Sequence, residues 1–345
     1  MTTVRQWFKA QGWTPQAFQK DCWKAYGEGK NGMLHAPTGS GKTFALWGGI
    51  LQEALKIKKH PVGIQALWIT PLRALAVEIQ QATQRMTSEL HPDLNIALRT
   101  GDTSQGERAK QKRKPSFGLV TTPESLHVLL STKDHPKSFQ HLKIIVVDEW
   151  HELLGTKRGV QVELAIAYLR SFLPELKVWG ISATLGNKEL AREILLGPIE
   201  NYVTVNAQIK KKIKVKSILP KNMESFPWRG HLGIHLLPQV LKLVQKNKTT
   251  LIFTNTRAQC EIWFHRLLEA DPNLAGSIAM HHGSIDKKIR LWVEDALRQE
   301  QLKVVVCTSS LDLGVDFSPV ENCVQIGSPK GVGRFIQRAG RSGHR

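Results

Sequence analysis

The chain has 345 residues, of which 41% are hydrophobic and 22% charged, an ordinary composition for a soluble globular protein with room for two full domains. Its formal net charge of +19 suggests a polyanionic partner such as nucleic acid, although a basic solvated surface would give the same value. No signal-peptide pattern and no apolar run as long as a membrane span occurs, so we expect a cytoplasmic protein with no membrane partner.

Short apolar segments alternate with helical patterns along the chain. We expect strands at residues 32–36, 67–70, 118–121, 144–147 and 178–181, and then at 250–253, 277–280, 304–307 and 323–326. Continuous apolar strands that alternate with helices predict parallel sheets covered on both faces, with ligands at the carboxyl ends of the strands. The sequence therefore predicts an α/β fold with two similar halves.

A lysine-rich stretch separates these halves. Residues 206–230 carry five lysines between positions 210 and 216, followed by Pro220, Pro227 and Gly230. We interpret this stretch as a solvated linker between a first domain, residues 1–205, and a second, residues 231–345, although its lysines could also contact phosphates. The second half has no phosphate-binding loop of its own, so we expect one nucleotide site between the two domains.

Residues 36–43 read Ala-Pro-Thr-Gly-Ser-Gly-Lys-Thr and lie between an expected strand and an apolar helix. This context indicates a P-loop for a nucleoside triphosphate, although Ala36 replaces the usual first glycine. Backbone N–H groups would surround the phosphates, Lys42 would reach the terminal ones and Thr43 would offer its hydroxyl to Mg²⁺. The expected nucleotide-binding residues of the loop are Thr38, Gly39, Ser40, Gly41, Lys42 and Thr43.

Asp148 and Glu149 follow the apolar segment at residues 144–147. Charges at the end of four branched apolar residues do not fit a solvated surface, so we expect them to face a ligand or a metal. Asp148 would hold Mg²⁺ together with Thr43, and Glu149 would orient and deprotonate an attacking water. With the P-loop, this pair predicts a hydrolase of nucleoside triphosphates.

The remaining motifs resemble those of superfamily 2 helicases. Residues 70–75, 121–125, 182–184, 253–257, 282–284, 308–316 and 337–345 look like their motifs Ia, Ib, III, IV, the one after IV, V and VI, in order. Gln19 resembles their adenine-reading glutamine, and residues 148–151 read Asp-Glu-Trp-His, which is similar to the box of DExH helicases. Residues 150–159 and 340–345 resemble Lhr-type (large helicase-related) DNA helicases, particularly the bacterial branch associated with DNA ligases.

This resemblance implies two tandem RecA-like P-loop domains that use ATP and Mg²⁺. It also implies a motor that moves 3′ to 5′ on single-stranded DNA or 3′-tailed duplex in DNA repair, is nucleoid-associated and meets repair proteins including a DNA ligase. Arg341 and Arg338 would act as arginine fingers, which supply roughly 10³–10⁵ in rate. Gln19, His151, Asp312 and Arg345 would join the nucleotide site; either His344 or Arg345 could face the phosphate where the family often has a third arginine.

The expected grip on nucleic acid is mostly phosphate contact. Strand ends that meet helix N-termini are favourable anion sites, and contacts there are independent of sequence and sensitive to salt. The candidates are Thr70, Arg73, Thr121 and Thr122 in the first half and Thr256, Arg257 and Thr308 in the second. The basic run at residues 108–114 is more typical of a solvated loop, or it extends this path.

Several alternatives stay open at this stage. An RNA helicase would carry the same motifs, because they grip phosphates and do not contact the 2′-hydroxyl. A nucleic-acid clamp that binds ATP without turnover is disfavoured by intact Lys42, Glu149 and Arg341, and a P-loop kinase leaves the second motif set unexplained. Because the sequence stops directly after motif VI, we expect a fragment with weak ATPase activity and poor duplex unwinding. The four scattered cysteines and the pair at residues 281–282 predict no metal site other than the one for Mg²⁺.

Overall fold

The computed structural model describes residues 3–37, 39–182, 187–209, 214–219, 233–312, 320–329 and 331–342. The chain divides into two compact units, Met1–Ile209 and Lys210–Arg345, and each unit has its own parallel sheet. None of the helices in these described stretches combines the length and the apolar character needed to cross a membrane.

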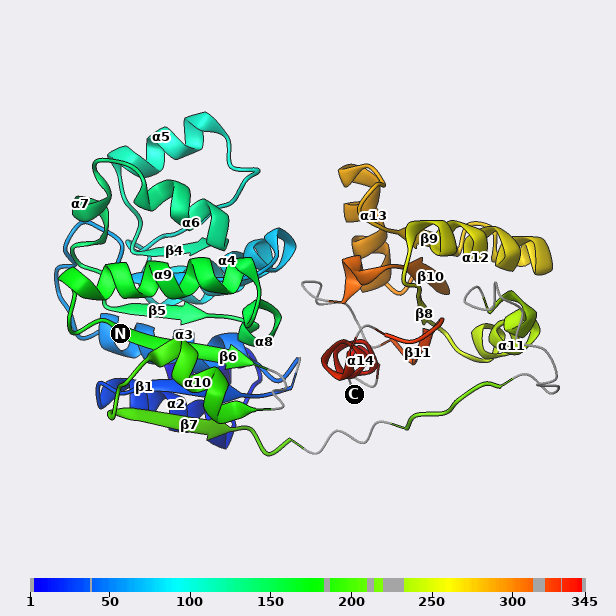
Figure 1. Ribbon diagram of the computed structural model, residues 1–345, viewed down its shortest axis with the longest axis horizontal. Helices are drawn as coiled ribbons and strands as arrows, with labels where there is room; N and C mark the ends of the chain where they lie inside the picture. The colour runs from blue at the N-terminus through cyan, green and yellow to red at the C-terminus, as the bar shows by residue number, and fades with distance from the viewer. Residues whose placement is uncertain are drawn as a thin grey trace. The chain divides into compact units, whose positions relative to one another are not determined.

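The first unit is built on a seven-stranded sheet in the order β3-β4-β2-β5-β6-β1-β7 (Figure 1). All neighbouring strands are parallel. The strands are β1 (Asn31–His35), β2 (Ala66–Ile69), β3 (Ile96–Arg99), β4 (Gly118–Thr121), β5 (Ile144–Val147), β6 (Lys177–Ser182) and β7 (Tyr202–Asn206). The five strands that the apolar segments predict are present. The two additional strands, β3 and β7, form the sheet edges, where half-exposed residues need no continuous apolar run.

Helices cover both faces of this sheet. One face packs against α1 (Val4–Ala10), α2 (Ala17–Gly27), α3 (Lys42–Ala54) and α4 (Arg73–Leu90). The other packs against α6 (Pro123–Leu130), α7 (His135–Phe139), α8 (Trp150–Leu153), α9 (Lys157–Phe172) and α10 (Lys188–Leu196), while α5 (Gln105–Arg113) has no buried residue. The side chains of Ile145 and Val146 enter opposite cores, as alternation along a strand requires.

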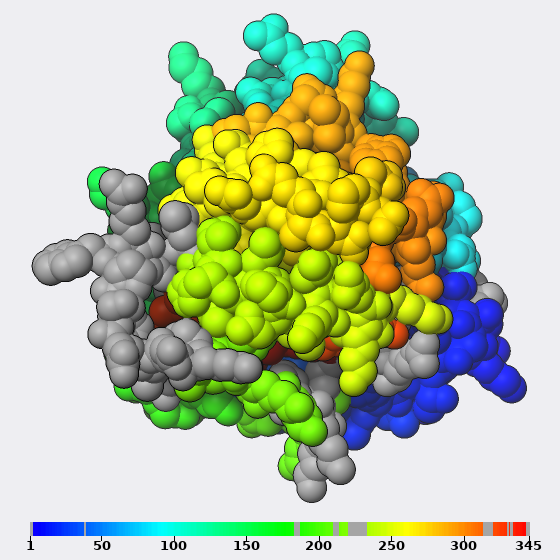
Figure 2. Space-filling model, turned by 90° about the vertical axis from the view of Figure 1, so that its right-hand side faces the viewer, coloured from blue at the N-terminus to red at the C-terminus, as the bar shows by residue number. Residues whose placement is uncertain are grey.

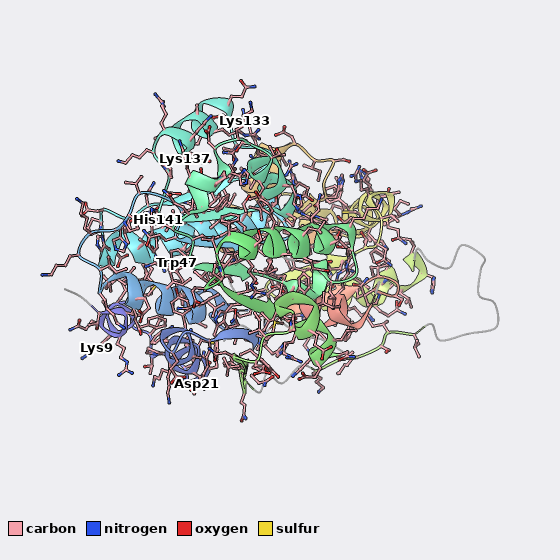
Figure 3. The ribbon with its side chains drawn as sticks, turned by 60° about the vertical axis from the view of Figure 1, so that its left-hand side comes forward. Lys9, Asp21, Trp47, Lys133, Lys137 and His141 are labelled. Atoms are coloured by element: carbon pink, nitrogen blue, oxygen red, sulfur yellow. The ribbon has the colours of Figure 1, made fainter. Side chains whose placement is uncertain are left out.

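Tryptophans fill much of both cores. Trp47, labelled in Figure 3, is 1% exposed, and its Nε1 donates to Thr87 Oγ1 at 3.0 Å. Trp150, next to the acidic pair, is also fully buried and donates to the Ala191 carbonyl at 2.8 Å. Trp150 is thus a packing residue with a satisfied N–H.

The first unit continues a few residues past the boundary expected at residue 205. Strand β7 runs parallel to β1 as far as Asn206, and the Ala207 N–H then donates to the His35 carbonyl at 2.8 Å. The compact unit extends to Ile209. Most of the expected linker, residues 206–230, lies outside the described residues.

The second unit contains a four-stranded parallel sheet in the order β11-β8-β10-β9 within its described residues. The strands are β8 (Thr250–Phe253), β9 (Ile278–His281), β10 (Val304–Cys307) and β11 (Asn322–Gln325), and the helices are α11 (Leu237–Lys246), α12 (Arg257–Ala270), α13 (Lys287–Arg298) and α14 (Val332–Ala339). Short 3₁₀ turns are η2 (Ile234–Leu236), η3 (Pro272–Leu274) and η4 (Ser309–Leu311). Helices α11 and α12 pack on one face through Val240, Val244 and Trp263 and are seen from outside in Figure 2, whereas α13 packs on the other.

Candidate nucleotide site and nucleic-acid-binding residues

The P-loop joins the carboxyl end of β1 to the first turn of α3. Gly39 and Gly41 both adopt left-handed backbone conformations, with φ values of 75° and 82°. A side chain at Gly41 would also place its Cβ 2.8 Å from Gln19 Nε2, which donates to the Gly41 carbonyl at 3.1 Å. Gln19 is therefore tied to the loop, whereas Thr38 lies outside the described residues.

This loop fits the phosphates of a nucleotide. Ser40 is 7% exposed, and its buried Oγ has no hydrogen-bond partner among the described residues. Gly41 is the N-cap of α3, whose first N–H groups and dipole favour an anion at that point. An unpaired buried hydroxyl beside a helix N-terminus is the arrangement that a bound phosphate would complete.

Lys42 and the two acidic residues form one buried cluster. The Lys42 ammonium donates to Glu149 Oε1 at 2.8 Å, with side-chain exposures of 9% and 4%. Burial and the neighbouring Glu149 raise the pKa of Asp148, while Lys42 opposes that rise. Asp148 Oδ1 accepts from the Glu149 N–H at 2.8 Å, and Oδ2 accepts from Trp68 Nε1 at 3.4 Å. Divalent cations take carboxylate and hydroxyl oxygens, so Asp148 and half-buried Thr43 suit Mg²⁺ chemically.

Glu149 is held in an unusual backbone conformation. Its φ of 48° is left-handed for a residue with a side chain, at the turn between β5 and α8. His151 Nδ1 lies 3.5 Å from Glu149 Oε2 and 3.1 Å from Ser182 Oγ, and burial lowers the pKa of His151. His151 thus connects the acidic box to the end of β6. The next residues of that motif, Ala183 and Thr184, lie outside the described part.

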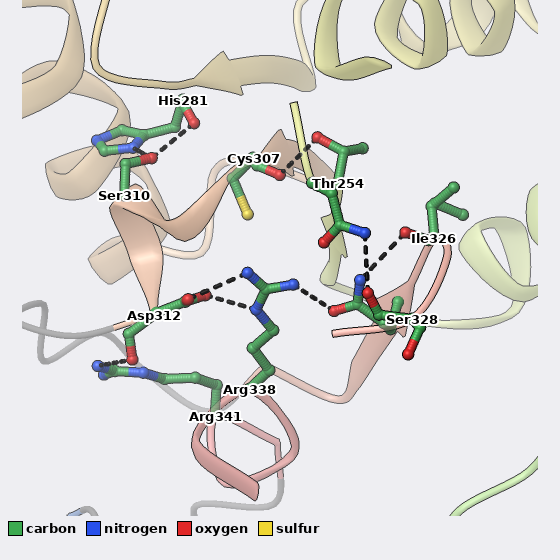
Figure 4. A network of polar contacts seen from close by, with 11 residues as sticks. Thr254, His281, Cys307, Ser310, Asp312, Ile326, Ser328, Arg338 and Arg341 are labelled. Atoms are coloured by element: carbon green, nitrogen blue, oxygen red, sulfur yellow. Dashed lines mark hydrogen bonds and ion pairs between the residues drawn. The ribbon is translucent and has the colours of Figure 1, made fainter. Parts of the chain in front are cut away.

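The candidate arginine fingers belong to a second cluster, in the second unit (Figure 4). Arg338 makes two bonds to the Asp312 carboxylate, at 2.6 and 3.1 Å, and a third to Gln325 Oε1. Its guanidinium also lies 4.9 Å from the centre of the Phe253 ring. Arg341 Nη2 donates to the Asp312 carbonyl at 3.0 Å, and Arg341 is 6% exposed. Residues 343–345, which include the candidate Arg345, lie outside the described residues.

The two arginines make different kinds of contact with Asp312. A buried bidentate ion pair with an additional amide contact gives Arg338 and Asp312 a structural function in joining α14 to the end of β10. Arg341 differs in that its Nη2 donates to a backbone carbonyl, that of Asp312, and not to the carboxylate. The roles of both as fingers stay predictions.

In the first unit, the predicted phosphate-gripping residues follow β2 and β4, which are adjacent strands. Thr70 and Thr121 are fully buried: the Thr121 hydroxyl donates to the Arg99 carbonyl at 2.7 Å, and that of Thr70 has no partner among the described residues. Thr122 is the N-cap of α6, and its hydroxyl bonds to Ser125 at 3.2 Å. Arg73 is exposed and pairs with Asp102 at 2.7 Å, so it is the most accessible of the four.

The second unit presents three such residues at the carboxyl ends of β8 and β10. The exposed Thr256 caps α12 by accepting from the Gln259 N–H at 3.2 Å. Arg257 is the first residue of that helix and is exposed. Thr308 is half-buried and follows β10, and its N–H donates to the His281 carbonyl at 3.2 Å.

Three residues that position this site were not predicted. Trp68, a core residue, bonds to Asp148; Gln325 bonds to Arg338; and Asp102 pairs with Arg73. Asp102 follows β3, the edge strand that the sequence pattern did not reveal. The sequence around Trp68 and Gln325 contains no pattern that would predict their hydrogen bonds to Asp148 and Arg338, which lie elsewhere in the chain.

Comparison with known families agrees with this geometry. The model for DEAD/DEAH box helicases matches residues 16–192, and the model for the helicase conserved C-terminal domain matches residues 233–345. The chain belongs to the DEAD/DEAH box helicase family. The predicted fold, two tandem RecA-like domains, is thereby confirmed.

Within this helicase family, the chain is similar to several Lhr-type helicases. The chain is 33% identical to the ATP-dependent helicase Lhr-Core of Sulfolobus acidocaldarius, over 99% of this chain and 41% of that protein. It is 30% identical to the Lhr helicase/probable uracil glycosylase of Mycolicibacterium smegmatis, over 99% of this chain and 25% of that protein. The structure of the Mycobacterium smegmatis helicase Lhr bound to ssDNA and AMP-PNP matches with a TM-score of 0.80 and 29% identity, over 99% of this chain and 46% of that chain. The resemblance to Lhr-type helicases is confirmed, and the chain spans about two fifths of its first curated relatives.

Proposed function

We propose that this chain is the ATP-hydrolysing motor of an Lhr-type DNA helicase. The observation that carries the proposal is the buried cluster of Lys42, Asp148 and Glu149 beside a glycine loop. In this loop the Ser40 hydroxyl has no partner among the described residues. A lysine, a metal-binding carboxylate and a general base within one phosphate-binding site are the minimum set for hydrolysis of a phosphoanhydride.

The residues divide this work. The P-loop N–H groups and Lys42 bind the β- and γ-phosphates of ATP, and Gln19, which is tied to Gly41, would recognise the base. Thr43 and Asp148 would hold Mg²⁺, which when bound neutralises charge on the phosphate oxygens. Glu149 takes a proton from the attacking water as the bond to the γ-phosphorus forms and the bond to the departing ADP oxygen breaks. The resemblance assigns Arg341 the role of an arginine finger in that reaction, which supplies roughly 10³–10⁵ in rate in comparable enzymes.

The nucleic acid is proposed to be single-stranded DNA or a 3′-tailed duplex. The supporting observations are the net charge of +19, the exposed Arg73 and Arg257 at strand ends, and the ssDNA in the mycobacterial Lhr structure. Movement in the 3′ to 5′ direction, a role in DNA repair, a DNA ligase among the partners and a cytoplasmic, nucleoid-associated location belong to the same proposal, which rests there on the resemblance.

The test is the rate of ATP hydrolysis without nucleic acid, with single-stranded DNA and with single-stranded RNA of the same sequence. Stimulation by DNA well above RNA, lost in Glu149→Gln and retained in the nearby control Glu152→Gln, supports the DNA motor. Equal or greater stimulation by RNA would replace it with an RNA helicase. ATP binding without turnover under any condition would indicate a clamp and contradict the proposal.

A further inference from the structure

A second candidate site lies in the first unit, away from the nucleotide. A cavity of about 220 Å³ is enclosed by the β3–β4 edge of the sheet, by α5 and by the segment from α6 to α7. We call it the α5 cavity. Ile64, Leu119 and Leu129 contribute apolar lining, whereas Arg99 and Arg108 contribute positive charge.

The two arginines share this cavity without a counter-ion. Within the described residues, no ion pair joins Arg99 or Arg108 to a carboxylate. Burial and then the nearby Arg108 lower the pKa of Arg99, as expected for like charges placed together. Arg108 Nη2 reaches only the carbonyls of Thr100 and Gly101, at 3.3 and 3.4 Å, and its buried Nε has no partner in the described part of the chain.

Asp134, the one carboxylate among the described residues that line the cavity, is already neutralised. Asp134 pairs with Lys112 at 2.6 Å, and the hydrogen bond from Lys112 lowers the pKa of Asp134. The segment that carries Asp134 also carries the exposed Lys133 and Lys137, which point outward near α5 in Figure 3. Among the described residues, no carboxylate is thus left to neutralise Arg99 and Arg108, and the surface around the cavity carries further lysines.

The α5 cavity adjoins the predicted phosphate-gripping edge through one loop. Residues 100–103 follow β3, and Asp102 in this loop pairs with Arg73. A side chain at Gly101 would place its Cβ 2.7 Å from Arg73 Nη2, so Arg73 lies directly against the loop. Arg108 holds the carbonyls of the same loop, so the predicted contact at Arg73 and the cavity lie on either side of it.

We propose that the α5 cavity binds a phosphate group through Arg99 and Arg108, and that this phosphate belongs to the nucleic-acid strand where it continues past Arg73. Planar guanidinium groups match the geometry of phosphate oxygens, and two of them without a counter-ion favour an anion between them. The inference rests on the proposed function, because it extends the same strand beyond the predicted motif contacts. The strand thus has a further anchor outside the nucleotide-dependent grip.

The test compares the double variant Arg99→Gln/Arg108→Gln with a matched control on the same helix. Lys110→Gln/Arg113→Gln removes two charges from exposed α5 residues that do not line the cavity. Binding of fluorescent single-stranded DNA of increasing length is measured across a range of salt. We expect the cavity variant to lower the slope of log affinity against log salt by about 0.7 for the lost phosphate contact, only with oligonucleotides long enough to pass Arg73. An unchanged slope, or an equal loss in the control, would overturn the proposal.

A second measurement separates the source of the phosphate and guards against misfolding. Thermal unfolding is followed with and without inorganic phosphate. Arg99→Gln alone should melt no lower than the wild type, because it relieves the repulsion from Arg108. If phosphate stabilises the wild type but not the double variant, the result supports a phosphate site in the α5 cavity. If the double variant nevertheless binds DNA as the wild type does, the cavity binds a free anion, and the proposal that the phosphate belongs to nucleic acid is overturned. A wild type that binds no DNA at all would instead refute the proposed function. The melting experiment with phosphate would still show whether the α5 cavity binds an anion.

Discussion

The Lys42 ammonium and the Glu149 carboxylate form a direct ion pair, 2.8 Å long, although 107 positions separate them in the chain. The lysine expected to bind phosphate and the glutamate expected to activate water therefore neutralise each other. Since a triphosphate would compete for the same ammonium, we expect nucleotide binding to loosen this pair. Glu149 would then be released to act as a base, which would couple occupancy of the site to its reactivity.

Glu149→Gln should separate binding from hydrolysis. The amide removes the charge that competes for Lys42, so we expect ATP affinity to be unchanged or higher. Turnover should fall by about 10²–10⁴, because the base that accepts the water proton is lost. Titration with a fluorescent ATP analogue and a phosphate-release assay measure the two effects. A parallel loss of affinity and turnover would show that the ion pair does not restrain Lys42.

Arg338→Ala should act mainly on stability. It leaves the Asp312 carboxylate buried without its bidentate partner, so we expect the second unit to lose about 3–5 kcal/mol of unfolding free energy. Denaturant unfolding of the full chain, with hydrogen exchange at β10 and α14, locates the loss. Arg266→Ala, which breaks an exposed pair with Glu269, is the control and should cost at most about 1 kcal/mol. Wild-type stability with turnover reduced by about 10³-fold or more would instead identify Arg338 as a finger.

Gly41→Ala should disable the P-loop while the rest of the fold persists. The new methyl group would meet Gln19 Nε2 at 2.8 Å on a backbone with a φ of 82°, so both the loop and the Gln19 contact must shift. We expect ATP binding to weaken by at least about tenfold and the cost in stability to be about 1–3 kcal/mol. Equilibrium binding and thermal melting measure these effects. Gly106→Ala, where nothing lies within 4 Å of the new Cβ, is the matched control and should bind ATP normally.

His35 should make the first unit sensitive to acid. Both of its buried ring nitrogens lack partners among the described residues, and burial, with Lys188 nearby, lowers the pKa of His35 to about 4. A lowered pKa means that the folded protein favours the neutral imidazole of His35 over the protonated one, whereas the unfolded chain binds the proton more readily. Stability is therefore complete above pH 6.5 and declines, by about 3 kcal/mol at most, as the pH falls from 6.5 through about 4.

His35→Gln should flatten this acid limb, measured as unfolding free energy between pH 7 and about pH 4. The substitution His141→Gln, at a half-buried position of the same unit, serves as the control, and its profile should follow that of the wild type (Figure 3). Equal slopes for the wild type and His35→Gln would mean that His35 is protonated in the folded protein without cost.

The sequence was most informative where the structure depends on contiguous residues. The P-loop and the acidic pair were recognisable because a strand, its terminal residues and the following helix are adjacent in the chain. Interior strands were visible as unbroken apolar runs, since both faces of a parallel sheet are covered. The edge strands β3 and β7 were not predicted, because half-exposed strands need no such run. Asp102, which follows β3, was therefore not predicted either.

What the sequence by itself determined is the helicase family, the fold class and the residue types at each strand end. Only the tertiary structure decided which residues lie together: Lys42 pairs with Glu149, Arg338 bonds to Asp312 and Gln325, and Arg99 and Arg108 line one cavity. The physical reason is that apolar periodicity specifies that a strand forms but not which strands become its neighbours. The order β3-β4-β2-β5-β6-β1-β7 arises from crossovers, and it is this order that brings distant side chains to one edge of the sheet.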